Sequence, residues 1–204
     1  MTIPRYAAIL GAMWLLFAFQ GGWADDRPQR PIVPGDIIVT FKPQTEGDRL
    51  LRRMAENPAD AEAALGSLAL DLGNKTGVPL LMKQRLSGHR LLLGVNCAAL
   101  EELVATQLRS QRTVAQIQIQ PHPSRTCPPS NSLPTLIVEL EPGGPDIQAD
   151  LSGAVTVPHN IRRDDHARLI IELDVPTLTL ALVDRLKHLP DLDSAQPNYV
   201  MTIR

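Results

Sequence analysis

The side chains that could support catalysis or metal binding are scattered along this sequence. The densest ionisable group, Asp164-Asp165-His166, is interpreted as a solvated turn between strands, with a weak cation site as the alternative. We find no Gly-rich phosphate loop, no nucleophile elbow and no Ser-His-Asp arrangement. We therefore expect no catalytic residue, no metal site and no cofactor. The histidines follow no metal-ligand spacing; they are His89, His122, His159, His166 and His188.

The two cysteines, Cys97 and Cys127, are the remaining candidates for chemistry. In an oxidising compartment a cysteine pair more often forms a disulfide than a metal or catalytic site. We therefore predict a bridge between them, and a pair of free thiols is the alternative.

Residues 1–24 have the pattern of a secretory signal. Arg5 supplies the positive charge, Ala7 to Phe19 form an apolar core, and Gly22-Trp23-Ala24 precede a cleavage site before Asp25. The apolar run is short for a membrane span, and an uncleaved anchor is the alternative. The sequence thus predicts export to a bacterial periplasm or to the outside, with no membrane attachment after cleavage.

The composition of the chain after residue 24 argues against nucleic-acid binding. Removing residues 1–24 takes away one of the 20 basic residues and none of the 22 acidic ones, so the net charge moves from −2 to −3. Nucleic-acid binding normally needs a basic face. The remaining aromatic residues are only Phe41 and Tyr199, which are too few for a stacking platform.

The first half of the chain is predicted to have the order β-α-β-β-α-β, the split βαβ or ferredoxin-like arrangement. The helix over 58–72 has an alternative, a longer helical region that begins near Gly47 and is broken at Pro58. Apolar periodicity and turn residues define the elements. These are a strand at 36–41, the helix at 58–72, strands at 80–86 and 90–95 around the turn 87–89, a helix at 98–110 and a strand at 113–120.

The second half repeats this order after a Pro/Ser-rich linker at 122–134. The predicted elements are a strand at 135–141, at most a short helix within 146–151, strands at 154–157 and 168–174, a helix at 177–189 and a strand at 192–200. After an extended leader at 25–34, we predict an α+β fold with two tandem ferredoxin-like units, 35–121 and 135–204. The alternative is one larger α+β domain in which the second half completes the first.

Two short segments resemble the subtilisin propeptide family, the inhibitor-like prodomains of secreted serine proteases. The opening segment, Val33 to Pro43, resembles the first strand of that family and contains Pro34, Gly35 and Phe41. The closing segment resembles its last helix and strand and contains Pro190, Ala195, Pro197 and Asn198. The two segments fall in different predicted units, and the end of the first unit, Gln118 to His122, resembles the closing segment only weakly. The resemblance therefore favours the C-terminal unit as the one that binds a protease.

The resemblance implies a binding mechanism. A prodomain of this family lays its four-stranded sheet over two helices of the protease and runs an extended tail through the active-site cleft, which is a form of strand addition. Met201 and Ile203 would fill pockets and the carboxylate of Arg204 would lie like a bound product, with a frayed terminus as the alternative. The tail comprises Tyr199, Val200, Met201, Thr202, Ile203 and Arg204.

The function expected from this resemblance is non-catalytic. The exported protein would bind a subtilisin-like serine protease in trans, as an inhibitor, a folding chaperone or both. The alternative is an interaction or scaffold module of the cell envelope with the same tandem fold.

Overall fold

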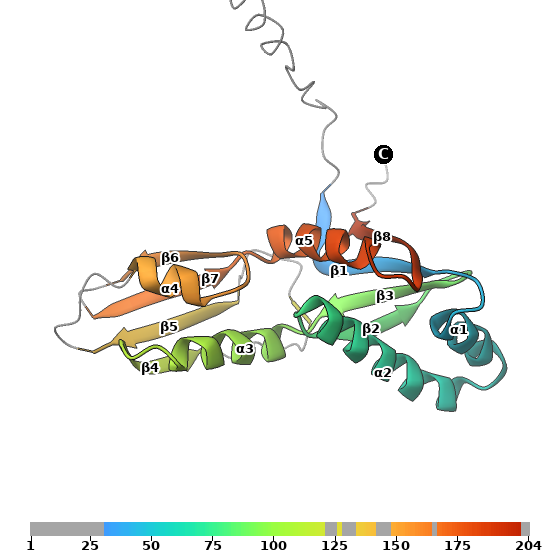
Figure 1. The fold of residues 1–204 in the computed structure, drawn as a ribbon, viewed down its shortest axis with the longest axis horizontal. Helices are drawn as coiled ribbons and strands as arrows, with labels where there is room; N and C mark the ends of the chain where they lie inside the picture. The colour runs from blue at the N-terminus through green and yellow to red at the C-terminus, as the bar shows by residue number, and fades with distance from the viewer. Residues whose placement is uncertain (1–30, 121–125, 128–133, 142–147, 165–166, 201–204) are drawn as a thin grey trace, which may run out of the picture. The chain divides into compact units, whose positions relative to one another are not determined.

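The computed structural model describes residues 31–120, 126–127, 134–141, 148–164 and 167–200 (Figure 1). Over these residues the chain is an α+β protein with two four-stranded antiparallel sheets and five helices. The proposed signal at 1–24, the leader up to residue 30 and the tail residues 201–204 lie outside the described part. Most of the proposed linker at 122–134 lies outside it as well.

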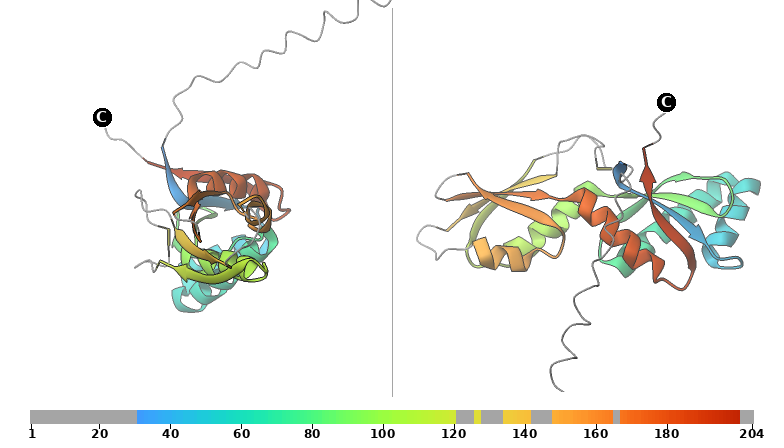
Figure 2. Two further views of the ribbon diagram at one scale, coloured as in Figure 1. Left: turned by 90° about the vertical axis from the view of Figure 1, so that its left-hand side faces the viewer. Right: turned by 90° about the horizontal axis from the view of Figure 1, so that it is seen from above.

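The first sheet joins strands from both ends of the chain in the order β2-β3-β1-β8. All neighbouring strands in it are antiparallel. The blue strand β1 and the dark red strand β8 lie side by side in Figures 1 and 2. The bounds are β1 Ile32–Phe41, β2 Leu80–Arg85, β3 Arg90–Val95 and β8 Leu192–Tyr199.

Three helices accompany the first sheet, and two of them pack directly against it. They are α2 (Pro58–Thr76), which contacts β2, and α5 (Val175–Lys187), which contacts β1 and β8. The third, α1 (Glu46–Glu56), packs on α2 and is separated from it only by Asn57. This confirms the alternative of a longer helical region interrupted at Pro58, since proline fits the first turn of a helix but not its interior.

The second sheet has the order β4-β5-β7-β6, again with antiparallel neighbours. Helix α3 (Cys97–Arg109) contacts β4 and β5 and also packs on the short helix α4 (Gln148–Ala154). The strands are β4 Val114–Ile119, β5 Thr135–Leu140, β6 His159–Arg163 and β7 Arg168–Leu173.

The strand pairing differs from the predicted division at 35–121 and 135–204. The predicted strand at 113–120 pairs with β5 in the second sheet, and β8 takes the place beside β1 in the first sheet. Residues 97–173 are therefore inserted between β3 and α5. Helix α5 and strand β8 of the second half thus complete the first sheet, while α3 and β4 of the first half belong to the second sheet. The local pattern does not decide this pairing, because α3–β4 and α5–β8 have the same helix–strand order.

The strand predicted at 154–157 is also wrong. This segment is the end of α4 and the turn after it, whereas β6 occupies His159–Arg163, between the strands predicted at 154–157 and 168–174. Val155 and Val157 are buried although they lie outside a strand. β6 is an edge strand with one apolar residue, Ile161, so its sequence lacks the apolar run of a buried strand.

Each sheet buries alternate residues on the face that its helices cover. In β1, Ile37, Val39 and Phe41 are buried, while Ile38 and Thr40 between them are half-buried. The strand period of two places the two sets on opposite faces. No helix in the described residues is long and apolar enough to cross a membrane.

Candidate functional site

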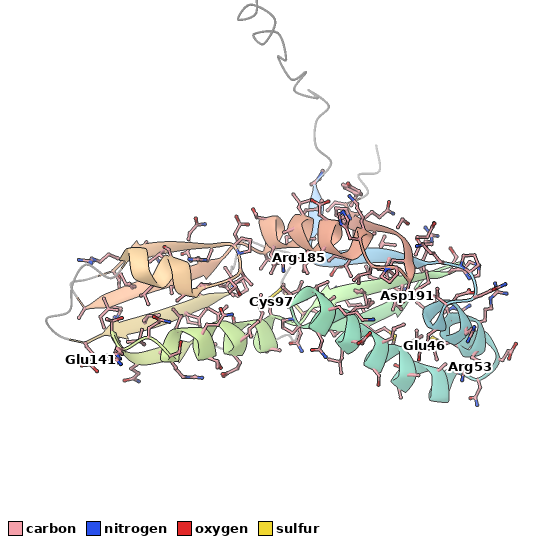
Figure 3. All side chains as sticks on the ribbon, viewed as in Figure 1. Glu46, Arg53, Cys97, Glu141, Arg185 and Asp191 are labelled. Carbon is pink, nitrogen blue, oxygen red and sulfur yellow. A yellow bond between two sulfur atoms is a disulfide. The ribbon has the colours of Figure 1, made fainter. Side chains whose placement is uncertain are left out.

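The opening and closing segments, far apart in the sequence, are neighbours in the first sheet. Ile38 lies opposite Gln196, and Val39 lies opposite Ala195. Beyond the strands, the backbone N–H of Lys42 donates to the carbonyl of Asp191 at 3.0 Å, and its Nζ donates to the carbonyl of Pro190 at 2.7 Å. Asp191 is labelled in Figure 3. The two halves of the resemblance thus form one continuous structural unit.

Gly35 holds the start of β1 against α5. Its backbone N–H donates to the Thr179 hydroxyl oxygen at 2.8 Å, and that hydroxyl donates to the Val175 carbonyl at 2.7 Å. Gly35 has a φ of 81°, and a Cβ atom there would lie 3.3 Å from the Cβ of Cys127. Both the positive φ and the close approach favour glycine at this position.

The face of the first sheet turned away from α2 and α5 is the candidate docking surface, and we name it the open face. Its centre is apolar, because the half-buried Ile38 lies opposite Leu92, which is itself only 9% exposed, on the neighbouring strand. Polar and charged side chains surround this centre. The register of the paired strands assigns to the open face Asp36, Ile38, Thr40, Leu81, Gln84, Arg90, Leu92, Gly94, Ser194 and Gln196, and the contacts with Asp36 add Lys83 and Asn198.

A buried carboxylate, that of Asp36, fixes three strands at one end of the open face. Its side chain accepts from Lys83 Nζ at 2.8 Å and from Asn198 Nδ2 at 3.3 Å. The stem of Lys83 crosses β3 at Gly94, where a Cβ atom would come within 2.7 Å of Lys83 Cδ. Gly94 therefore makes room for the contact, and Asn198 of the closing segment completes it.

The remaining named residues of the opening and closing segments form part of the first sheet or of the turn that precedes β8. Pro34 is half-buried in β1, while Phe41 is buried and its ring leaves no room for a Cβ atom at Gly47. Pro190 is exposed in the turn before β8, whereas Ala195 and Pro197 are buried on the helix-covered face.

The tail begins at the free edge of β8. Tyr199 and Val200 are 42% and 46% exposed, which is unusual for large apolar side chains in this molecule. The Val200 N–H donates to the Pro31 carbonyl at 2.8 Å, so the strand pairing continues to this residue. Met201, Thr202, Ile203 and Arg204 lie outside the described residues.

The predicted disulfide between Cys97 and Cys127 is confirmed. Cys97, labelled in Figure 3, begins α3 immediately after the first sheet. Cys127 lies close to Gly35 of β1. An isolated antiparallel β-bridge between the backbones of Asn96 and Thr126 lies beside the disulfide. The disulfide therefore ties the segment between β4 and β5 back to the point where the chain leaves the first sheet.

Sequence reasoning missed an ionic cluster around Asp48, near the start of α1. Its buried carboxylate accepts from the Gln44 N–H at 2.8 Å and from Arg52 Nε at 3.2 Å, and it contacts His89 Nδ1 from the turn between β2 and β3. The hydrogen bond from Gln44 lowers the pKa of Asp48, burial opposes this, and Arg52 and His89 lower it further. The cluster ties α1 to the hairpin, and no periodic pattern marks it.

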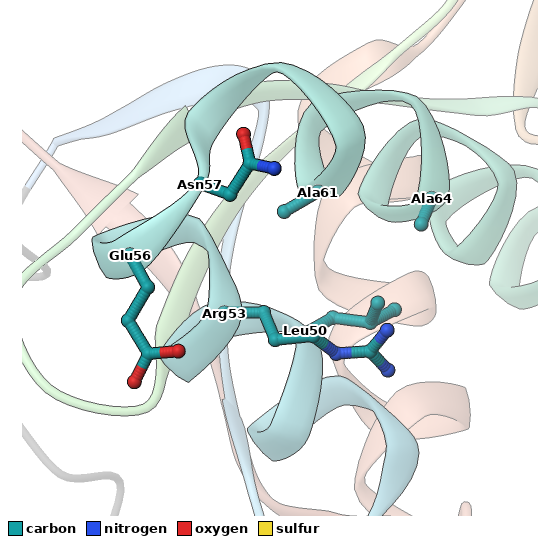
Figure 4. Close-up of a pocket in the computed structure, with 6 residues that line it drawn as sticks. All are labelled: Leu50, Arg53, Glu56, Asn57, Ala61 and Ala64. Atoms are coloured by element: carbon teal, nitrogen blue, oxygen red, sulfur yellow. The ribbon is translucent and has the colours of Figure 1, made fainter.

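Two surface hollows among the described residues bring together no nucleophile with a base. One of them, of about 330 Å³, lies where the end of α2 meets Ala99 and Leu103 of α3. In the described residues, no three His, Cys, Asp or Glu side chains are placed to hold a metal ion. The hollow of Figure 4, about 230 Å³ between α1 and α2, is lined by Leu50, Arg53, Glu56, Asn57, Ala61 and Ala64.

Comparison with protein-family models, with curated proteins and with solved structures found no match for this chain. The site is therefore defined by its own geometry: an open sheet face with an apolar centre, and an exposed edge strand that leads into the tail.

Proposed function

We propose that this chain is an exported, non-catalytic protein that binds a subtilisin-type serine protease, as an inhibitor, a folding chaperone or both. In this proposal each sheet with its two covering helices is a ferredoxin-like unit, and the first unit is the protease-binding one. The disulfide fits the oxidising compartment that export requires.

One observation supports this proposal most strongly. The opening and closing segments that resemble the propeptide family pair as β1 and β8 of one sheet, with Asn198 bonded to Asp36 and Lys42 bonded to Pro190. A resemblance that fell on two unrelated domains would not bring these residues into contact. These contacts support a binding unit built on the first sheet, and not a separate C-terminal domain, in this proposal.

The open face and the tail would act together. The half-buried Ile38 at the apolar centre would be covered by the protease, while the polar and charged side chains around it would pair with polar groups of the protease. From Tyr199 onward the chain would extend along the cleft, where backbone hydrogen bonds supply affinity and alternate side chains supply specificity.

Inhibition of a subtilisin-type protease by the chain from Asp25 onward tests this function. A version that ends at Val200 is the appropriate truncation, because it keeps all of β8 and the Val200–Pro31 hydrogen bond. We expect inhibition by the longer chain to weaken at least about tenfold on truncation, as expected for losing several strand-addition contacts. Refolding of the denatured protease with and without the chain tests the chaperone role.

A matched pair of substitutions tests the open face. Ile38→Glu places a charge at the centre of the proposed interface. Ile137→Glu is the control, because it places the same charge at the equivalent position on β5 of the second sheet, outside the proposed interface. Both side chains are half-buried, so the two changes have similar structural costs. We expect only Ile38→Glu to weaken inhibition. If neither the tail nor Ile38 matters, the envelope interaction module becomes the better explanation.

A further inference from the structure

The two sheets are built from two copies of one structural repeat. Asn96 and Asp174 each follow the third strand of a repeat and cap the next helix, accepting from Ala99 N at 3.2 Å and Thr177 N at 3.0 Å. Each cap also donates its own N–H to a proline carbonyl that precedes the second strand of its repeat. The partners are Pro79 before β2 and Pro158 before β6, both at 2.9 Å.

The correspondence continues through the following helix and strand at constant spacing. After α3, the N–H of Gln111 donates to the carbonyl of Leu108, and the N–H of Val114 donates to the carbonyl of Gln111. After α5, the N–H of Leu189 donates to the carbonyl of Leu186 in the same way, and the N–H of Leu192 donates to the carbonyl of Leu189. In the strands, Gln118 lies opposite Ile137, and Gln196 lies opposite Ile38. Thus α3–β4 and α5–β8 are equivalent elements.

Each of these elements completes the sheet of the other repeat. Helix α3 and β4 leave the first repeat and pack on the second sheet, while α5 and β8 leave the second repeat and pack on the first. We infer that two molecules of this chain can make the same exchange, with α5–β8 of one molecule docking beside β1 of the other. The partner in this interaction is a second copy of this chain.

The contacts of α5–β8 support this inference because they are made to the first repeat. Arg185 donates to the Thr76 carbonyl at 2.8 Å, Thr179 accepts from Gly35, and Lys42 holds the turn before β8. The link to the second sheet is the single residue Asp174 between β7 and α5. The docking surface is therefore the same whichever molecule supplies the element, and short hinges favour exchange.

Two observations identify α5–β8, and not α3–β4, as the exchanged element. The disulfide closes a loop around α3 and β4, whereas α5–β8 follows both cysteines and carries no such tether. The position of Thr179 corresponds to Glu101 in α3, which is buried and whose Oε1 has no hydrogen-bond partner in the described residues. On the second sheet the residue that corresponds to Gly35 is Pro134, which has no N–H to donate. Helix α3 therefore lacks the counterpart of the Gly35–Thr179 hydrogen bond, which gives α5 a specific docking contact on the first sheet.

Mixed cross-linking of two full-length variants tests the exchange. Ile38→Cys and Gln196→Cys chains are prepared separately, mixed, unfolded without reductant and refolded together under mild oxidation. Directly opposite residues on paired strands lie close to disulfide distance. A bridge between molecules at positions 38 and 196 is favoured when β8 of one chain lies against β1 of another, and chance collisions supply the background that the control measures. The matched control mixes Ile38→Cys with Gln118→Cys, which marks the equivalent position on β4.

We expect covalent heterodimers whose yield rises with protein concentration during refolding, because dilution favours exchange within one molecule. The Gln196→Cys mixture should exceed the Gln118→Cys mixture by about tenfold, the advantage expected of a specific pairing over chance collision. Size-exclusion chromatography of the unmodified chain, refolded in parallel, should show the same concentration-dependent dimer. Monomer at every concentration, or equal yields from both mixtures, would overturn the inference. Neither result depends on protease binding.

Discussion

At the scale of single residues, Glu101 is the most informative side chain that the site does not use. It is 2% exposed on the buried face of α3, and burial raises its pKa to about 7, with a smaller contribution from Glu102. A carboxyl group whose pKa is higher in the folded state stabilises the fold at low pH. That stabilisation is lost as the pH rises from about 4.5 through about 7.

Glu101→Gln should therefore stabilise the protein at pH 8 and have little effect at pH 4.5. The upper limit of the gain is about 3 kcal/mol, from 1.4 kcal/mol per pKa unit. Urea denaturation of both proteins across this pH range measures the difference. Glu102→Gln is the control, since the exposed Glu102 is only the lesser cause of the shift. A difference that does not grow with pH would show that Glu101 is not buried as a neutral acid.

At the scale of elements, the two helix caps provide a matched test of the repeat. Asn96→Ala and Asp174→Ala each remove a side-chain acceptor from the first turn of a helix. Each should lower the free energy of unfolding by about 1 kcal/mol. Chemical denaturation measures the loss, and Asp193→Ala, an exposed change within β8, should have a much smaller effect. Unequal losses at the two caps would argue that the repeats are not energetically equivalent.

At the scale of the whole molecule, the disulfide is the feature with the largest expected effect on stability. It joins residues 30 positions apart, and closing a loop of this length restricts the unfolded chain. Replacing both cysteines by serine should cost about 3 kcal/mol. Thermal unfolding of the double variant measures this loss. Wild-type protein unfolded with and without a reductant provides the control, and the reduced protein should match the variant. An unchanged melting temperature would contradict the prediction.

The sequence by itself determined most of the local structure. Eight of the twelve predicted elements appear within two residues of both expected bounds, because buried helix and strand faces impose periods that can be read along the chain. The proline at position 58 correctly marked the break between two helices. Strand β6 was not predicted, because this edge strand has a single apolar residue, Ile161, and therefore shows no apolar alternation. The disulfide was predicted from the presence of just two cysteines together with the predicted export of the chain.

Only the tertiary structure decided which strands are neighbours. Both α3–β4 and α5–β8 present an apolar helix face and a half-buried strand, so either could complete the first sheet as far as local pattern is concerned. The choice rests on contacts between distant residues, such as Gly35 with Thr179 and Asp36 with Asn198. The ionic cluster of Asp48 and His89 and the burial of Glu101 are likewise consequences of packing. Pairing between remote segments depends on three-dimensional complementarity, which a one-dimensional period does not encode.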